Sequence, residues 1–146
     1  MSRLMSVKVV DFPSSSAYTD ATKFLLVDDN TTTHTSEALA VYRNDGAMTL
    51  LMEFTGSTAA KRDIKVGYTI GDTKDGEFVV PSGDTVNVNI DSTTELDTWT
   101  AGINGNYRTA ISFTPINTKW LKILILGTDG NTDTSIKTKL MFQEDN

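Results

Sequence analysis

The segment KWLKILILGTDGNTDTSIKTKL, which runs from Lys119 to Leu140, decides the fold class of this chain. Two apolar runs flank a polar stretch of Gly, Thr, Asn and Asp, and these residue types favour turns. In the second run, Lys137 and Lys139 alternate with residues suited to a core. Such alternation is typical of a strand with one face on the core and the other in water. The segment therefore predicts two antiparallel strands joined by a tight turn.

The first of these two strands is apolar on both faces. Leu121, Ile123 and Ile125 share one face, and Trp120 and Leu124 lie on the other. One face must line the core, so the other needs a cover. A loop or the N-terminal segment of the same chain is one possible cover, and a neighbouring subunit is the second, because exposed apolar patches commonly mark interfaces. The second possibility makes Leu121, Ile123 and Ile125 candidate oligomer-interface residues.

Similar short runs recur along most of the chain. Residues 48–54 and 64–70 alternate between apolar and polar types, and Asn44–Gly46 is a strong hairpin-turn signal. Ser92 and Glu95 have the spacing of a helix capping box, so one short helical turn is expected at 92–99. About eight to ten short strands with closely spaced turns predict an all-β fold, an antiparallel β-sandwich of jelly-roll or immunoglobulin-like type. The pattern contains one helical turn at most.

Length and composition are those of one globular domain. The chain has 146 residues, of which 38% are hydrophobic and 22% are charged. We expect residues 1–12 to form an N-terminal arm or an edge strand. Residues 13–146 are then expected to form a single β-sandwich domain.

Charge and cysteine content exclude several classes of function. The formal net charge of −6 argues against partners such as nucleic acid or anionic lipid, which bind basic surfaces. The chain has no cysteine, so disulfides and thiolate metal sites are ruled out. No apolar run approaches the about 18 residues that a membrane-spanning helix needs, and the N-terminus lacks a signal-peptide pattern.

Catalytic and metal-binding motifs are poorly supported. His34 is the single histidine, and it lies in a polar stretch that predicts a solvated loop. The run DGNTD at Asp129–Asp133 begins like a calcium loop, but Leu140 stands where an EF-hand needs a bidentate glutamate. We therefore expect no enzymatic activity, no cofactor and no metal.

A glycan-binding surface is the stronger alternative among binding functions. Trp99 and Tyr107 flank the loop TAGINGN, where both rings would be exposed, and Arg108 follows directly. Tyr and Arg are also enriched at interface hot spots. Trp120 lies within a strand, so its ring is expected in the core.

The run from Val80 to Phe142 resembles the C-terminal halves of small structural proteins of tailed phages, such as head decoration (cement) proteins. The likeness rests on an aromatic-led strand (Trp120–Leu126), a polar turn, and a closing strand near the C-terminus. It implies a non-enzymatic β-sandwich protein that binds the major capsid protein on the outer surface of the shell. It also implies a homotrimer, and a virion location after synthesis in the host cytoplasm.

The resemblance gives the N-terminal arm a role in reaching along the shell. The candidate capsid contacts are Arg3, Leu4, Met5, Val7 and Val9. The alternative is a tail or fibre module, or another β-sandwich module, that binds a host receptor or glycan through Trp99, Tyr107 and Arg108.

Overall fold

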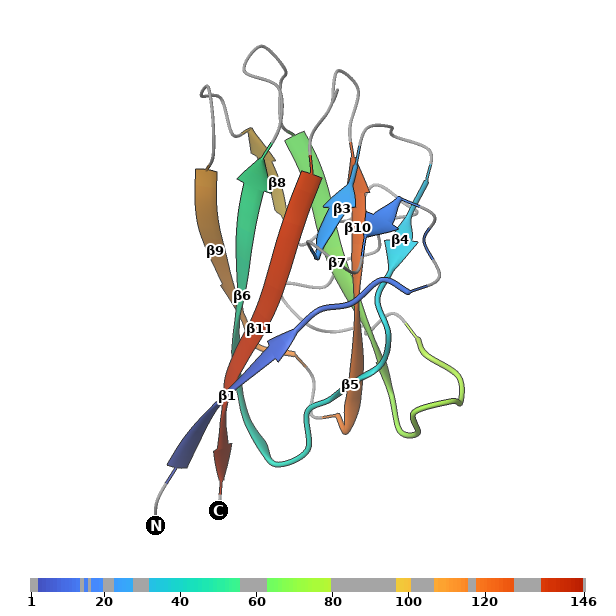
Figure 1. Ribbon diagram of the computed structural model, residues 1–146. Helices are drawn as coiled ribbons and strands as arrows, with labels where there is room; N and C mark the ends of the chain where they lie inside the picture. Colours follow the sequence, from blue (N-terminus) through green and yellow to red (C-terminus); the bar gives the residue numbers. More distant parts are fainter. Residues whose placement is uncertain are drawn as a thin grey trace.

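The fold is an antiparallel β-sandwich, seen here in a computed structural model (Figure 1). The structure describes residues 3–13, 15, 17–19, 23–27, 32–55, 63–79, 97–100, 107–115, 118–127 and 135–145. These residues form eleven strands and no helix, so none of them belongs to a helix that could span a membrane. The strands are β1 (Arg3–Val9), β2 (Tyr18–Thr19), β3 (Phe24–Leu26), β4 (His34–Thr35), β5 (Leu39–Ala40), β6 (Asn44–Thr55), β7 (Asp63–Gly71), β8 (Asp97–Thr100), β9 (Tyr107–Phe113), β10 (Trp120–Gly127) and β11 (Ser135–Asp145). The predicted fold class is confirmed.

The strands form two sheets in which every pair is antiparallel. Sheet A has the order β2-β3-β11-β6-β9, with β1 also paired to β11. Sheet B has the order β4-β10-β7-β8, with β5 also paired to β10. In both sheets, one long strand has one neighbour on one side and two neighbours that follow each other on the other side. On β11 these two neighbours are β3 and β1, and on β10 they are β4 and β5.

The core lies between the two sheets and follows the period-two pattern of the sequence. On β6, Met48 and Leu50 are buried while Thr49 between them is only partly buried. The same rule holds on β11, where the predicted inward face is confirmed. Burying this apolar surface is the main stabilising term of the fold. The largest fully buried side chains are those of Tyr68, Phe12, Phe142, Leu25, Met48, Leu50, Met52, Leu121 and Ile123.

The structure corrects the interface expected at Leu121, Ile123 and Ile125. These side chains are 0%, 1% and 0% exposed, because they point from β10 toward sheet A and pack in the core. They are therefore not available to a second subunit. The outward face of β10 carries Trp120 and Leu124, which are half-buried.

The helical turn expected at 92–99 is also corrected in part. Asp97–Thr100 is strand β8, which pairs with β7 through the register Ile64↔Trp99 and Val66↔Asp97. The free edge of β7 offers backbone partners along this whole segment, and such a ladder outweighs a capping signal. Residues 92–96 lie outside the described part of the chain.

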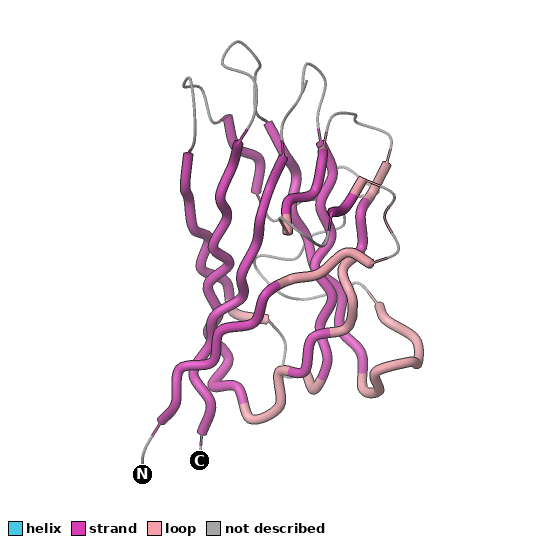
Figure 2. Tube along the Cα trace, viewed as in Figure 1, coloured by secondary structure: helices cyan, strands magenta, loops and turns pink. Residues whose placement is uncertain are grey.

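The connections that matter for the site lie at one end of the sandwich. Residues 41–43 join β5 to β6, and residues 72–79 follow β7. Figure 2 shows both connections as loops in the lower part of the view, the end at which the two termini also lie. The outward face of sheet B is therefore bordered by loops at this end.

Candidate functional site

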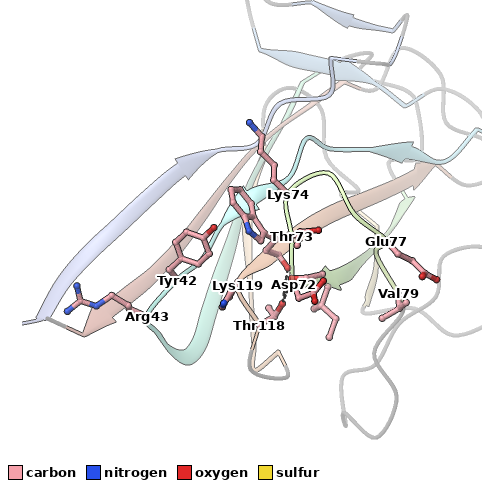
Figure 3. Close-up of a pocket in the computed structure, with 12 residues that line it drawn as sticks. Tyr42, Arg43, Asp72, Thr73, Lys74, Glu77, Val79, Thr118 and Lys119 are labelled. Atoms are coloured by element: carbon pink, nitrogen blue, oxygen red, sulfur yellow. Dashed lines mark hydrogen bonds between the residues drawn. The ribbon is translucent and has the colours of Figure 1, made fainter.

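An open groove of about 1190 Å³ lies at this end of sheet B (Figure 3). Its lining comes from three segments that are distant in sequence, namely residues 42–43, 70–79 and 118–120. Sheet register brings these segments together, because β10 pairs with β5 on one side and with β7 on the other. The groove is therefore a product of tertiary structure.

Trp120 is the central apolar residue of the groove. Its cross-strand neighbours are Ala40 on β5 and Gly71 on β7, so small residues flank the indole on both sides. Directly opposed residues share a face of the sheet and normally cover each other. Here the small neighbours leave the half-buried indole open to the groove. The expectation that Trp120 belongs to the core is therefore wrong.

Tyr42 forms an aromatic pair with Trp120. The two ring centroids are 5.2 Å apart with an interplanar angle of 82°, which is an edge-to-face arrangement. Tyr42 is 44% exposed, so part of its ring remains free for a ligand. Two adjoining aromatic rings thus contribute to the apolar part of the groove, together with Ile70 and Val79.

The segment that carries Tyr42 is held in place by backbone contacts. The amide N–H of Val41 donates to the carbonyl of Lys119 at 2.9 Å. The side-chain amide of Asn44 donates to the carbonyl oxygens of Val41 at 2.7 Å and of Thr118 at 3.3 Å. These bonds tie the 41–44 turn to the start of β10, so Tyr42 and Trp120 keep their relative positions.

The opposite wall is the 72–79 segment, which folds back onto β7. Ile70 and Val79 exchange two backbone hydrogen bonds of 2.9 Å. Thr118 donates from its hydroxyl to the carbonyl of Gly71 at 3.0 Å, or to that of Trp120 at the same distance. The wall is therefore fixed to β7, and Thr118 connects the end of β7 to the start of β10.

Phe78 covers part of the outward face of sheet B next to this wall. The ammonium of Lys122 lies 4.4 Å from the centroid of the Phe78 ring, a cation–π contact. A Cβ atom on Gly71 would lie 3.1 Å from that ring, so only glycine fits without a shift. The 72–79 segment of the same chain thus supplies part of the cover that the two-sided apolar strand needs.

Polar and charged groups stand around the aromatic pair. Asp72 and Glu77 belong to the 72–79 segment, and Figure 3 shows Glu77 on the opposite side of the groove from Tyr42. Lys74 and Lys119 add donors, and all four residues are exposed. Carboxylates accept hydrogen bonds and ammonium groups donate them. The groove can therefore hold a ligand that has both an apolar face and many hydroxyl groups.

The residues expected to bind glycan belong to strands of two different sheets. Trp99 is in β8 of sheet B, whereas Tyr107 and Arg108 are in β9 of sheet A. Arg108 is strongly exposed and forms a 3.8 Å ion pair with Glu53. Arg108 does not line the groove. The alternation of the sequence could have identified the groove residues. It places the side chains of Trp120 and Tyr42 on the face of the sheet that points away from the core.

His34 is buried rather than solvated. Its ring is 8% exposed in β4, and its Nδ1 lies 2.8 Å from the hydroxyl of Ser15. Among the described residues, no group of three or more His, Cys, Asp or Glu side chains could hold a metal ion. The calcium-like run Asp129–Asp133 lies outside the described residues.

A small polar cluster fixes the start of the domain. The hydroxyl of Tyr18 donates to Asp11 at 2.5 Å, and the ammonium of Lys23 lies 3.3 Å from the same carboxylate oxygen. Desolvation alone would raise the pKa of Asp11, but the hydrogen bonds from Tyr18 and Lys23 outweigh it and lower that pKa. Burial, together with the negative charge of Asp11, raises the pKa of Glu37. The cluster therefore has a structural explanation.

The candidate capsid contacts lie on strand β1. Met5, Val7 and Val9 are 60%, 54% and 41% exposed. Arg3 and Leu4 are in the same strand. In the described part of the chain, the exposed large hydrophobic residues lie either on β1 or, as Tyr42 and Val79, in the groove.

No protein-family model matches the sequence, and no curated protein matches it. Its fold is similar to that of several solved structures. One is the CBM36-1 domain of a multidomain xylanase from the hindgut metagenome of Trinervitermes trinervoides, with a TM-score of 0.52, 9% identity, and coverage of 93% of this chain and 96% of that domain. Another is the CBM22-1-GH10 structure of Clostridium thermocellum xylanase 10B in complex with xylohexaose, with a TM-score of 0.53, 10% identity, and coverage of 99% of this chain and 26% of that one.

A third similar structure is dimeric latent PorU from Porphyromonas gingivalis, with a TM-score of 0.50 and 10% identity. The match covers 99% of this chain and 13% of PorU. At such low identities, these likenesses show a shared fold. The chain is thus similar in fold to β-sandwich carbohydrate-binding domains and to one part of a larger protein.

Proposed function

We propose that this protein is a non-catalytic carbohydrate-binding module that takes a saccharide chain in the groove around Trp120 and Tyr42. The observation that carries the proposal is the partly exposed aromatic pair in an open groove of about 1190 Å³, bordered by charged side chains. The fold likeness to carbohydrate-binding domains supports it. The capsid partner, the trimer and the virion location stay predictions of the sequence.

A sugar ring fits the chemistry of this groove. The C–H groups of a pyranose form an apolar face that can pack on the negative face of an aromatic ring. The hydroxyl groups at the edge of the ring can donate to Asp72 and Glu77 and accept from Lys74 and Lys119. Charge-assisted hydrogen bonds of this kind orient the ligand, whereas the aromatic contacts provide buried area.

The open shape of the groove favours a chain over a free monosaccharide. Both walls belong to loops at the end of sheet B, so the groove is not closed around a single ring. Several sugar units would therefore be needed to bury enough surface for stable binding. Binding through few anchors on an exposed surface also predicts fast dissociation.

The test is a titration of the protein with a panel of oligosaccharides that includes xylohexaose, monitored by calorimetry. Trp120→Ala should weaken binding of the preferred oligosaccharide at least about 30-fold, because hot-spot aromatic residues contribute about 2 kcal/mol or more. Tyr42→Ala, at an exposed turn position, gives a second variant in case Trp120→Ala affects folding. Arg108→Ala is the control, because Arg108 is an exposed residue outside the groove.

The expected outcome is loss of binding in both groove variants and unchanged binding in the control. The proposal is wrong if no oligosaccharide in the panel binds. It is equally wrong if folded Trp120→Ala and Tyr42→Ala proteins bind as well as the unmodified protein. Loss of binding in Arg108→Ala alone would instead favour the site predicted from the sequence.

A further inference from the structure

Strand β1 presents an apolar stripe at the edge of sheet A. Its exposed side chains are Met5, Val7 and Val9, and Met141 of β11 is paired with Val7 beside them. Large exposed hydrophobic residues are otherwise found, among the described residues, only at the groove. A contiguous apolar stripe of this kind on a small acidic protein indicates a surface that binds a partner.

The unpaired backbone groups belong to the same residues as the exposed side chains. Val10 donates its N–H to the carbonyl of Thr138 at 3.1 Å, and the register Val9↔Lys139 places Val10 opposite Thr138. In an antiparallel ladder, hydrogen-bonded and non-hydrogen-bonded pairs alternate. The even-numbered residues of β1 therefore bond to β11, and the N–H and C=O groups of Met5, Val7 and Val9 point away from it.

This outer side of β1 lies at an edge of sheet A. Among the strands that the structure describes, β11 is the partner of β1, and none pairs with the other side of β1. A free edge with apolar side chains is a template for another strand, and proteins usually protect such an edge with charges, prolines or a covering segment. β1 contains no proline, its lysine Lys8 alternates with the exposed residues Val7 and Val9, and no strand of the described part of the chain covers this side.

We propose that β1 pairs with β1 of a second copy of this chain, antiparallel and across a two-fold axis at Val7. In this register Met5 of one copy lies opposite Val9 of the other, and Val7 lies opposite Val7. Each of these pairs joins residues whose backbone groups have no strand partner in the described part of the chain, so each would form two hydrogen bonds. The same residues place apolar side chains against apolar side chains.

Charge selects this register over its neighbours. It brings Lys8 of one copy opposite Ser6 of the other, so the two lysines do not face each other. A shift of one residue on each strand toward the C-terminus would place Lys8 opposite Lys8, and like charges directly opposite each other are unfavourable. The opposite shift would place Val9 against Arg3. An isologous contact of this kind closes after two copies, which argues for a dimer rather than an open fibre.

The dimer should be weak, because a single strand pair buries less surface than a standard interface. The mass in solution should therefore rise with concentration, from one chain of 15.9 kDa toward twice that value. Sedimentation velocity over the micromolar range measures this directly, without any saccharide. The result is thus independent of the proposed glycan binding.

Val7→Lys is the principal test variant, because it places two lysines opposite each other at the two-fold axis. It should raise the dimer dissociation constant at least about tenfold, the effect of 1.4 kcal/mol. Ala110→Lys is the matched control, since it adds the same charge at an exposed position of β9, at the other edge of sheet A. Val7→Pro is a second variant that removes only an outward-pointing N–H, and it should also give monomers.

A cysteine variant tests the register itself. The chain contains no cysteine, so Val7→Cys introduces a single thiol per copy. Directly opposed residues in a hydrogen-bonded pair are about 5.5 Å apart at Cα, which a disulfide can span. Mild oxidation should link the Val7→Cys protein into dimers, and Ala110→Cys should stay unlinked.

A concentration-dependent dimer that Val7→Lys and Val7→Pro disrupt, and that Val7→Cys traps, would support the proposal. A monomer at all concentrations would overturn it. A trimer would also overturn it, in favour of the assembly that the sequence resemblance implies. A dimer unaffected by folded Val7 variants would place the interface elsewhere.

Discussion

Strands β10 and β11 occupy equivalent positions in their sheets, but their outward faces differ. Each has a long antiparallel neighbour on one side and two neighbours on the other. The outward face of β11 carries Lys137 and Lys139, as expected for a face in water. The outward face of β10 carries one lysine, Lys122, but also the apolar residues Trp120 and Leu124. The difference shows that an apolar residue on an outer sheet face points to a cover or a binding surface.

The largest expected effect tests which face of β10 is the core face. Leu121→Ala should lower the free energy of unfolding by about 2–5 kcal/mol, because it leaves a cavity at a fully buried position. Leu124→Ala, on the half-buried outward face, should cost clearly less. Urea denaturation of both variants measures the difference. Equal losses would contradict the assignment of the two faces.

An intermediate effect is expected at Gly71, where the 72–79 wall lies close to β7. Gly71→Ala would place a Cβ atom 3.1 Å from the Phe78 ring and 3.1 Å from the carbonyl oxygen of Glu77, so the wall must shift. We expect a stability loss of about 1–3 kcal/mol from this overpacking and several-fold weaker saccharide binding.

Thr69→Ala is the control for Gly71→Ala, because Thr69 is the preceding outward position on β7. Its effect on unfolding should stay within about 0.5 kcal/mol. Thermal unfolding and calorimetric titration of both variants provide the measurement. Unchanged binding in Gly71→Ala would show that the wall next to Phe78 does not shape the groove.

The smallest expected effect is the pH dependence at Asp11. The pKa of Asp11 is lowered in the folded state, so its contribution to stability is present above the unfolded value near 3.8 and is lost as the pH falls through the folded pKa. Asp11→Asn should reduce this acid loss by less than about 1 kcal/mol, the size expected for a partly exposed pair. Denaturation at pH values from acid to neutral measures the slope.

Glu37 is a control for Asp11, because its contribution to stability changes with pH in the opposite direction. Its raised pKa means that the folded state holds the proton more tightly, so this group favours folding below its unfolded value near 4.5 and loses that contribution as the pH rises through the folded pKa. Glu37→Gln should steepen the acid loss rather than reduce it. If both variants changed the acid loss of stability in the same direction, the interactions assigned to Asp11 and Glu37 would be wrong.

Much of the fold could be predicted from the sequence, because the alternation of apolar and polar residues within each strand indicates which side chains are buried. The alternation around Leu50 and Val66 was sufficient to place these residues in the core. The pattern was ambiguous where both faces of a strand are apolar, and there Leu121 was assigned to an interface. The capping-box spacing before Trp99 wrongly predicts a helical turn for a related reason. A local sequence pattern contains no information about the edge of β7 that lies beside this segment.

The candidate site could be predicted only in part. Aromatic residues were expected to bind glycan, but Trp99 and Tyr107 were chosen because they flank a polar loop. The residues that share the groove are Tyr42, Gly71 and Trp120, and no spacing rule connects them. They meet because β10 pairs with both β5 and β7. The cross-strand neighbours of Trp120 are small, so its indole stays accessible.

The sequence by itself determined that this protein is an antiparallel β-sandwich, because period-two alternation is imposed by the backbone of each strand. Tertiary structure alone decided which apolar face of β10 entered the core, where Trp120 opens to the surface, and which edge of β1 stays free. These choices depend on which strands become neighbours. Pairing between distant segments is a property of the whole chain, so no local pattern contains it.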